Sequence, residues 1–144
     1  MQRFFLLLWA LILPLQSFAI MRTDAFQEND IPDNLWVCSV FQNEGPYLRE
    51  WIEYHRMIGA EHFILFNNNS DDDYLNILDP YIQDKVVTLV EWPTPRHQAS
   101  YNQTGAIRQA LNMSRGKTRW LASIDIDEFI VPMYTENLVD FLRS

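Results

Sequence analysis

Short apolar runs alternate along the chain with segments that have the spacing of helices. Four runs are typical of strands buried on both faces, at residues 35–41, 62–66, 85–92 and 120–126. Helical spacing or capping residues predict helices at residues 46–58, 74–78, 98–113 and 138–142. Residues 129–131 either continue the fourth strand or begin another. This alternation predicts an α/β fold, with a mostly parallel sheet covered by helices on both faces.

Turn and capping residues set the expected boundaries. Pro46 suits the first position of a helix and Gly59 the end of the same helix. The helix that begins at residue 74 is expected to stop at Asp79-Pro80. Residues 20–34 are polar and mixed, which predicts a linker ahead of a domain at residues 35–144.

Polar clusters follow three of the predicted strands: residues 43–44, residues 67–73 and residues 125–128. In an open α/β sheet, ligands bind beyond the carboxyl ends of the strands. If the strands are parallel, all three clusters therefore lie at one edge of the sheet.

The most specific of these clusters contains Asp125 and Asp127 within an apolar run. On a strand, residues i and i+2 face the same way, so the two carboxylates are expected to converge on one hard cation. Such a cation can also bind phosphate oxygens. The alternative is a solvated strand end whose acids cap the next helix. The apolar flanks favour the metal site, because a buried acid is costly unless it is paired or metal-bound.

The other polar residues can be interpreted either as ligand contacts or as structural residues. Asn69 and Asp71 can contact a ribose or a base edge, or belong to a loop in which Asp72 or Asp73 caps the next helix. Asn43 and Glu44 form either a nucleotide contact or a turn. Gln98, with His97, opens the long helix, where backbone N–H groups suit a phosphate. His55 is interpreted as a packed or surface residue.

Composition narrows the function classes. The chain has 144 residues, of which 48% are hydrophobic, enough for one domain with a core. A net charge of -8 repels a phosphate backbone, which argues against nucleic acid as a partner. A small anionic substrate remains compatible if a metal supplies positive charge. Cys38, the single cysteine, lies in an apolar run and is interpreted as a buried structural thiol.

The N-terminus has the pattern of a secretory signal peptide. Arg3 precedes an apolar stretch at residues 4–15, and small residues precede a cut after Ala19. A short signal-anchor, which would tether the chain to a membrane, and an apolar element of the mature fold are the alternatives. Either leading option places the domain in the secretory pathway. Three glycosylation sequons, at Asn68, Asn102 and Asn112, agree with this.

Taken together and in order, several motifs resemble those of glycosyltransferase family 92 and related family 2-like enzymes. They are residues 38–44, 47–48, 50–55 and Gly59, then residues 62–70, and finally Gln98, Trp120 and residues 125–132. The resemblance covers residues 35–132.

The resemblance implies a GT-A fold, a nucleotide-diphosphate-sugar donor, a glycan or glycoprotein acceptor and a divalent cation, usually Mn²⁺. It places Asp125 and Asp127 at the metal. It places Asn43, Glu44, Asn69 and Asp71 at strand ends that face the nucleotide, and Gln98 at a matching position. The N-terminal pattern predicts the Golgi or ER lumen, or secretion, for such an enzyme.

Enzymes of this kind continue well beyond the metal motif, whereas this sequence ends twelve residues after Pro132. No catalytic base can be nominated, and the GT-A domain is expected to be incomplete. A donor-binding remnant that does not turn over its donor is therefore an alternative. A phosphatase-like D-x-D hydrolase is a weaker one, since Phe129 stands where such sites need Thr or Val.

Overall fold

The computed structural model describes residues 19–22, 31–95 and 102–143, which form a five-stranded sheet in the order β1-β5-β2-β3-β4. The strands are β1 (Ala19–Arg22), β2 (Leu35–Phe41), β3 (Ala60–Asn67), β4 (Val87–Glu91) and β5 (Trp120–Ser123). β5, β2, β3 and β4 run parallel, and β1 pairs antiparallel with β5 at the edge. The α/β expectation, with a mostly parallel, Rossmann-like sheet, is confirmed.

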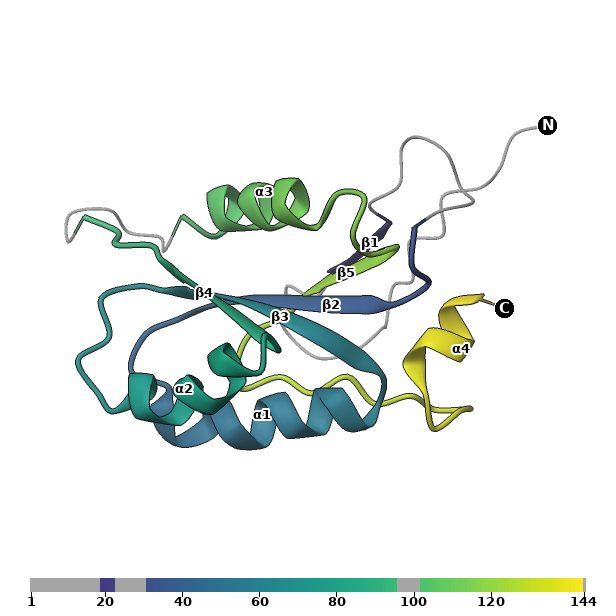
Figure 1. The fold of residues 1–144 in the computed structure, drawn as a ribbon, viewed down its shortest axis with the longest axis horizontal. Helices are drawn as coiled ribbons and strands as arrows, with labels where there is room; N and C mark the ends of the chain where they lie inside the picture. The colour runs from purple at the N-terminus through teal and green to yellow at the C-terminus, as the bar shows by residue number, and fades with distance from the viewer. Residues whose placement is uncertain (1–18, 23–30, 96–101, 144) are drawn as a thin grey trace, which may run out of the picture.

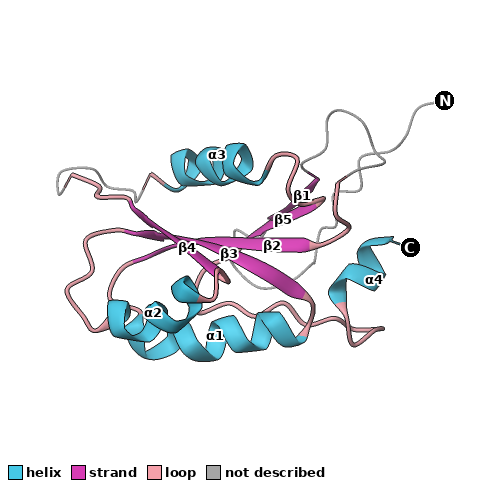
Figure 2. Cartoon of the chain, in the orientation of Figure 1, coloured by secondary structure: helices cyan, strands magenta, loops and turns pink. Residues whose placement is uncertain are grey.

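Helices cover both faces of the sheet (Figures 1 and 2). α1 (Gly45–Met57) and α2 (Tyr74–Gln83) lie on one face, and α3 (Gln103–Ser114) lies on the other. The short α4 (Leu138–Arg143) lies beside the end of the sheet at which the parallel strands begin. β2, β3 and β5 are thus mostly buried on both sides, which explains why their sequences are almost continuously apolar, whereas the edge strand β4 is only partly buried.

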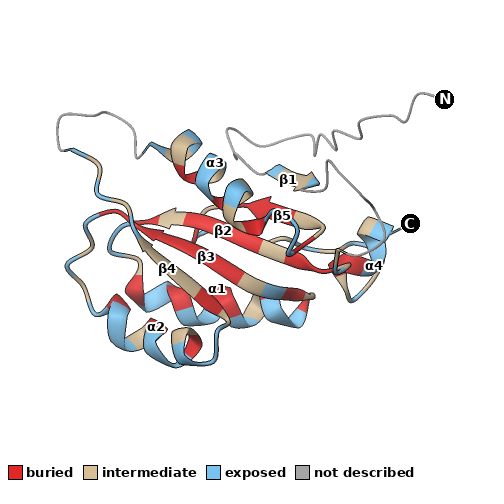
Figure 3. Cartoon of the chain, turned by 45° about the horizontal axis from the view of Figure 1, so that its top comes forward, coloured by how far each residue is buried: buried red, intermediate tan, exposed pale blue. Residues whose placement is uncertain are grey.

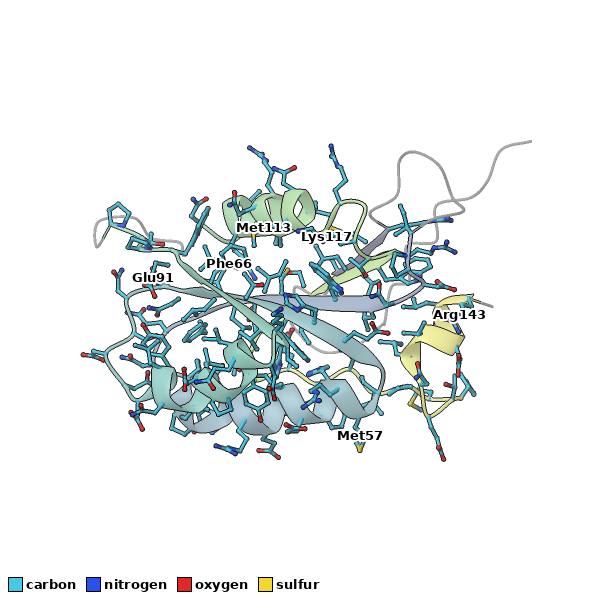
Figure 4. All side chains as sticks on the ribbon, viewed as in Figure 1. Met57, Phe66, Glu91, Met113, Lys117 and Arg143 are labelled. Carbon is cyan, nitrogen blue, oxygen red and sulfur yellow. The ribbon has the colours of Figure 1, made fainter. Side chains whose placement is uncertain are left out.

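Two hydrophobic cores result, and Figure 3 shows the central strands as the most buried part of the fold. The larger core packs alternate residues of β2 and β3 against α1 and α2, around the fully buried Leu48, Trp51 and Phe63. The smaller core lies under α3, where Ala106 and Ala110 bring the helix close to the sheet. Phe66 and Met113 lie together on this side (Figure 4).

The predicted end of α2 is wrong, because the helix continues through Pro80 to Gln83. Proline costs one hydrogen bond within a helix. Tyr81, the residue after Pro80, is buried, and its hydroxyl donates to Glu53 Oε1 at 2.8 Å. This packing against α1 holds the helix past the point at which local propensity would end it.

Two segments near β5 differ from expectation. Ala19, the last residue of the expected signal segment, and residues 20–22 of the expected linker form strand β1, because the edge of β5 offers it backbone partners from Trp120 to Ser123. β5 itself ends at Ser123, and residues 129–131 form no strand. The other residues of the expected signal segment, 1–18, lie outside the described residues. In the described part of the chain, no helix has the length and apolar character needed to cross a membrane.

Candidate functional site

The carboxyl ends of the four parallel strands meet at one edge of the sheet, on the left in Figure 1. The loops that leave β2, β3 and β5 at this edge carry the three polar clusters of the sequence. Glu91 ends β4 at the same edge (Figure 4). The parallel sheet thus brings the three clusters to one edge, as expected.

The loops after β2 and β3 are joined by paired hydrogen bonds. The backbone N–H of Asn43 donates to Ser70 Oγ at 2.9 Å, and the N–H of Asp71 donates to Asn43 Oδ1 at 2.9 Å. Asn43 and Asn69 both adopt positive φ, a conformation that asparagine tolerates better than most residues. Asn43 and Asp71 therefore belong to one exposed surface.

The buried side-chain amides of Asn67 and Asn68 fix the loop that follows β3. Asn67 Nδ2 donates to Glu91 Oε2 at 2.8 Å and to the Tyr74 hydroxyl, while Asn67 Oδ1 accepts from the N–H of Ser70. Asn68 Oδ1 accepts from the N–H of Thr94 at 2.8 Å. These two residues are structural, and they fix the loop that presents Asn69 and Asp71.

The capping role expected within the loop belongs to Asp72, at a different helix. Asp72 Oδ2 accepts from the N–H of Gly45 at 2.7 Å, at the start of α1. Asp73 occupies the N-cap position of α2 without a side-chain capping bond. A Cβ at residue 45 would lie 2.7 Å from Asp72 Oδ2, so a larger residue there would displace the Asp72 carboxylate from the N–H that it caps.

Asp125 and Asp127 lie on a turn and not on a strand, which corrects the expected geometry. Pairing of β5 with β2 stops at Ser123, and the N–H of Glu128 then donates to the carbonyl of Asp125 at 3.1 Å. Ile124 and Ile126 are buried in the larger core, while Asp125 is half-buried and Asp127 exposed. The alternation of the sequence therefore survives the turn and keeps both acids out of the larger core.

Helices from both faces contact this turn. Trp51 Nε1 on α1 donates to the carbonyls of Asp125 and Glu128, at 3.0 Å each. Gln103 Nε2 on α3 donates to Asp125 Oδ1 at 3.2 Å. Sequence reasoning missed both residues, although Trp51 lies within the predicted helix at residues 46–58.

The residues after the turn are also fixed by α1. The Tyr54 hydroxyl donates to the carbonyl of Ile130 at 3.0 Å, and His55 Nε2 accepts from the N–H of Ile130 at 3.3 Å. His55 Nδ1 therefore carries the proton and donates to the carbonyl of Trp51 at 2.8 Å. Burial lowers the pKa of His55 to about 4. His55 is a packed core residue, as interpreted from the sequence.

The carboxylates at this edge of the sheet repel one another, which disfavours the charged form of each. Burial and then the charge of Asp127 raise the pKa of Asp125. Burial, followed by the charges of Asp127, Asp72 and Asp125, raises the pKa of Glu44, and burial also raises that of Glu128. The loop after β2 and the turn after β5 thus share one negative field, which favours a cation.

Comparison with known proteins assigns the chain to a family. The model of glycosyltransferase family 92 matches residues 34–144. The chain belongs to glycosyltransferase family 92. No solved structure gives a significant match.

Curated relatives of this family 92 chain come from plants. It is 32% identical to a glycosyltransferase family 92 protein of Ricinus communis over 114 residues, which is 78% of this chain and 20% of the relative. It is 34% identical to one of Oryza sativa over 112 residues, 77% of this chain and 18% of the relative. A galactan beta-1,4-galactosyltransferase of Arabidopsis thaliana is 30% identical over 74% of this chain and 22% of that protein. The chain therefore spans about a fifth of the length of these relatives.

The donor atoms of this family 92 chain suit a hard cation that keeps other ligands. Within the described residues, no three His, Cys, Asp or Glu side chains are grouped so that they could hold a metal. Asp125 and Asp127 supply the carboxylate pair. Mg²⁺-like ions are usually bound by one or two carboxylates together with waters and substrate phosphates. The pair is therefore compatible with an ion of this kind.

A hollow of about 200 Å³ adjoins this edge of the sheet, where the chain leaves β4. Both polar and apolar residues line it: Glu91, Trp92, Pro93, Thr94, Pro95 and Asn102. A larger open hollow, lined by residues that include Met57 and Val86, lies at the opposite edge, away from the acidic turn. Gln98 and His97 fall outside the described residues.

Proposed function

We propose that this chain forms the donor-binding part of a metal-dependent family 92 glycosyltransferase. Its donor is a nucleotide-diphosphate sugar and its acceptor a glycan or glycoprotein. The observation that carries the proposal is the acidic turn Asp125–Glu128 at the carboxyl edge of a parallel sheet, beside the loop pair of Asn43 and Asp71. Family membership supports transfer of a sugar over the phosphatase-like alternative.

Asp125 and Asp127 hold the metal, for which we propose Mn²⁺. A cation held by these two carboxylates would neutralise the nucleoside diphosphate, which is the leaving group in sugar transfer. Without the cation, the negative field that couples Glu44, Asp125 and Asp127 repels such a ligand. The carboxylates therefore serve the donor only through the metal.

The nucleotide side of the site is assigned to Asn43, Glu44, Asn69 and Asp71, with Gln98 as a further candidate. The loops of Asn43 and Asp71 are already joined by hydrogen bonds, so the surface is preorganised. Asn69 Nδ2 donates to the carbonyl of Thr94 at 3.3 Å, which links this surface to the hollow after β4. Preorganised polar groups lose little conformational entropy when a ligand binds.

Calorimetry with Mn²⁺ and a panel of nucleotide-diphosphate sugars tests the proposal, beginning with UDP-galactose because one relative is named a galactosyltransferase. Asp125→Asn and Asp127→Asn each remove one carboxylate charge with little change of shape. Both should abolish Mn²⁺-dependent binding. Asp79→Asn, which removes an equal charge from the exposed side of α2, should leave it unchanged.

Two results would contradict the proposal in different ways. If the unaltered chain binds none of the donors with Mn²⁺ present, donor binding is refuted. If it binds a donor and both carboxamide variants bind it equally well, Asp125 and Asp127 are not the metal ligands.

We also propose that the protein enters the secretory pathway. The support is the N-terminal sequence, with Arg3, the apolar residues 4–15 and the small residues Ser17 and Ala19, together with the exposed sequons. Asn102 and Asn112 are exposed, whereas Asn68 is buried and holds the β3 loop. The proposal therefore rests on two of the sequons.

A further inference from the structure

One indole N–H spans both ends of the acidic turn. Trp51 is fully buried on α1, and its Nε1 lies 3.0 Å from the carbonyl oxygens of both Asp125 and Glu128. These are the first and last residues of the turn, which the N–H of Glu128 closes on the carbonyl of Asp125. The backbone that carries both carboxylates is therefore fixed to α1 at its two ends by a single donor.

We propose that Trp51 is a positioning residue for the metal, which sets the separation of the Asp125 and Asp127 carboxylates without touching the ion. The inference rests on the proposed metal-dependent function and assigns a residue to the support of that site. It concerns the N–H group of Trp51 and not the hydrophobic bulk of its ring.

The surroundings of Trp51 make it a rigid support. Its ring packs against His55 at 4.7 Å and against Phe63 at 5.6 Å between centroids. Tyr54 and His55, three and four residues further along α1, hold Ile130 just beyond the turn. Residues at this spacing share one face of a helix. α1 thus presents a row of three polar-tipped side chains to the backbone of residues 125–130.

The turn needs such support because its own charges oppose a compact arrangement. Asp125, Asp127 and Glu128 follow one another within four residues, and Glu44 adds charge from the loop after β2. Like charges at this spacing push the carboxylates apart until a cation neutralises them. A backbone fixed at two points keeps the oxygens near the geometry that a hard cation requires.

The experiment separates the N–H group from the packing of the ring. In one variant of the full chain, Trp51 is replaced by β-(3-benzothienyl)alanine, which keeps the bicyclic shape and has sulfur in place of N–H. Trp51→Phe is the second variant. Ile52→Val is the packing control, because Ile52 is equally buried on α1 and its side chain has no hydrogen-bonding group.

The readouts are Mn²⁺ affinity, from electron paramagnetic resonance of the free ion, and thermal unfolding of each variant. Loss of a residue that supports metal ligands costs about 10- to 100-fold in metal affinity. We expect a loss of this size in both Trp51 variants, with a melting temperature near that of the unaltered chain for the benzothienyl variant. Ile52→Val should lower the melting temperature and keep the Mn²⁺ affinity.

Three outcomes overturn the inference. The first is a benzothienyl variant that binds Mn²⁺ within twofold of the unaltered chain. The second is an Ile52→Val variant that loses as much affinity as Trp51→Phe, because general destabilisation then explains the effect. The third is an unaltered chain that binds no Mn²⁺, which refutes the proposed metal site itself and with it the role of Trp51.

Discussion

The two faces of the sheet contribute to the acidic turn in different ways. On the α1 face, the large side chain of Trp51 fixes the backbone of the turn, and its neighbours fix the residues that follow. On the α3 face, the helix packs through Ala106 and Ala110, and the contact that the structure describes is between Gln103 and the carboxylate of Asp125. One face therefore determines where the turn lies, and the other orients one of its oxygens.

Core truncations should show the largest contrast between the faces. Leu48→Ala on the α1 face removes a fully buried side chain, and we expect a loss of about 2–5 kcal/mol in the free energy of unfolding. Leu111→Ala on the α3 face removes a half-buried one, for which about 1 kcal/mol is expected. Urea denaturation measures both. Equal losses would show that the two cores support the fold alike.

The pH dependence of stability should come mainly from His55 on the α1 face. Its pKa is about 4 in the fold, below the ordinary histidine pKa of 6.5, so the unfolded chain binds the proton more tightly. The stabilisation is complete above pH 6.5 and is lost as the pH falls toward 4. The shift corresponds to about 3 kcal/mol.

The matched comparison for His55 is His62, whose ring packs against Trp36 on the opposite face. Burial also lowers the pKa of His62, which is only half-buried. Unfolding free energies between pH 7 and pH 4 should fall less steeply in His55→Gln than in the unaltered chain, and about as steeply in His62→Gln. If His62→Gln reduces the pH dependence of the unfolding free energy more than His55→Gln does, His62 and not His55 is its main source.

The smallest effect is expected at the outer surface of α3. If the protein enters the secretory pathway, exposed Asn112 accepts a glycan, and Asn112→Gln should remove part of the endoglycosidase-sensitive mass while changing stability within about 0.5 kcal/mol. Asn68→Gln should leave the glycan mass unchanged, because Asn68 is buried. Mass spectrometry of protein secreted from eukaryotic cells would detect either result, and a glycan on Asn68 would contradict the structure.

Much of the fold follows from local patterns in the sequence. The continuous apolar run at 35–41 and the helical spacing from Pro46 predict β2 and α1 almost to the residue. β2 is buried along nearly its whole length and α1 along one face, so burial leaves a clear pattern in each sequence. Local reasoning failed where a distant partner decides the outcome. Tyr81 carries α2 past Pro80 through its contact with Glu53, and β1 exists because β5 offers it an edge.

In the candidate site, too, local sequence predicts some features, and others depend on distant partners. The position of Asp125 and Asp127 at the sheet edge follows from their place after an apolar strand. The turn that carries them could not be read from the sequence, because it depends on where pairing with β2 stops and on a hydrogen bond from Trp51, 74 residues earlier in the chain. The roles of Asn67 and Asn68 as buried supports were likewise hidden, since their partners lie on the loop and strand that follow.

The order of the strands has a consequence for the time at which this chain can acquire its structure. β2, β3 and β4 are neighbours both in the sheet and in the sequence, so they can assemble early in synthesis. β5 is the last strand of the sheet to be made, yet it occupies the place between β1 and β2. Contacts between residues so far apart carry a large loop-closure entropy and slow the approach to the native state. The acidic turn, which follows β5, is therefore completed only after the other strands of the sheet have been made.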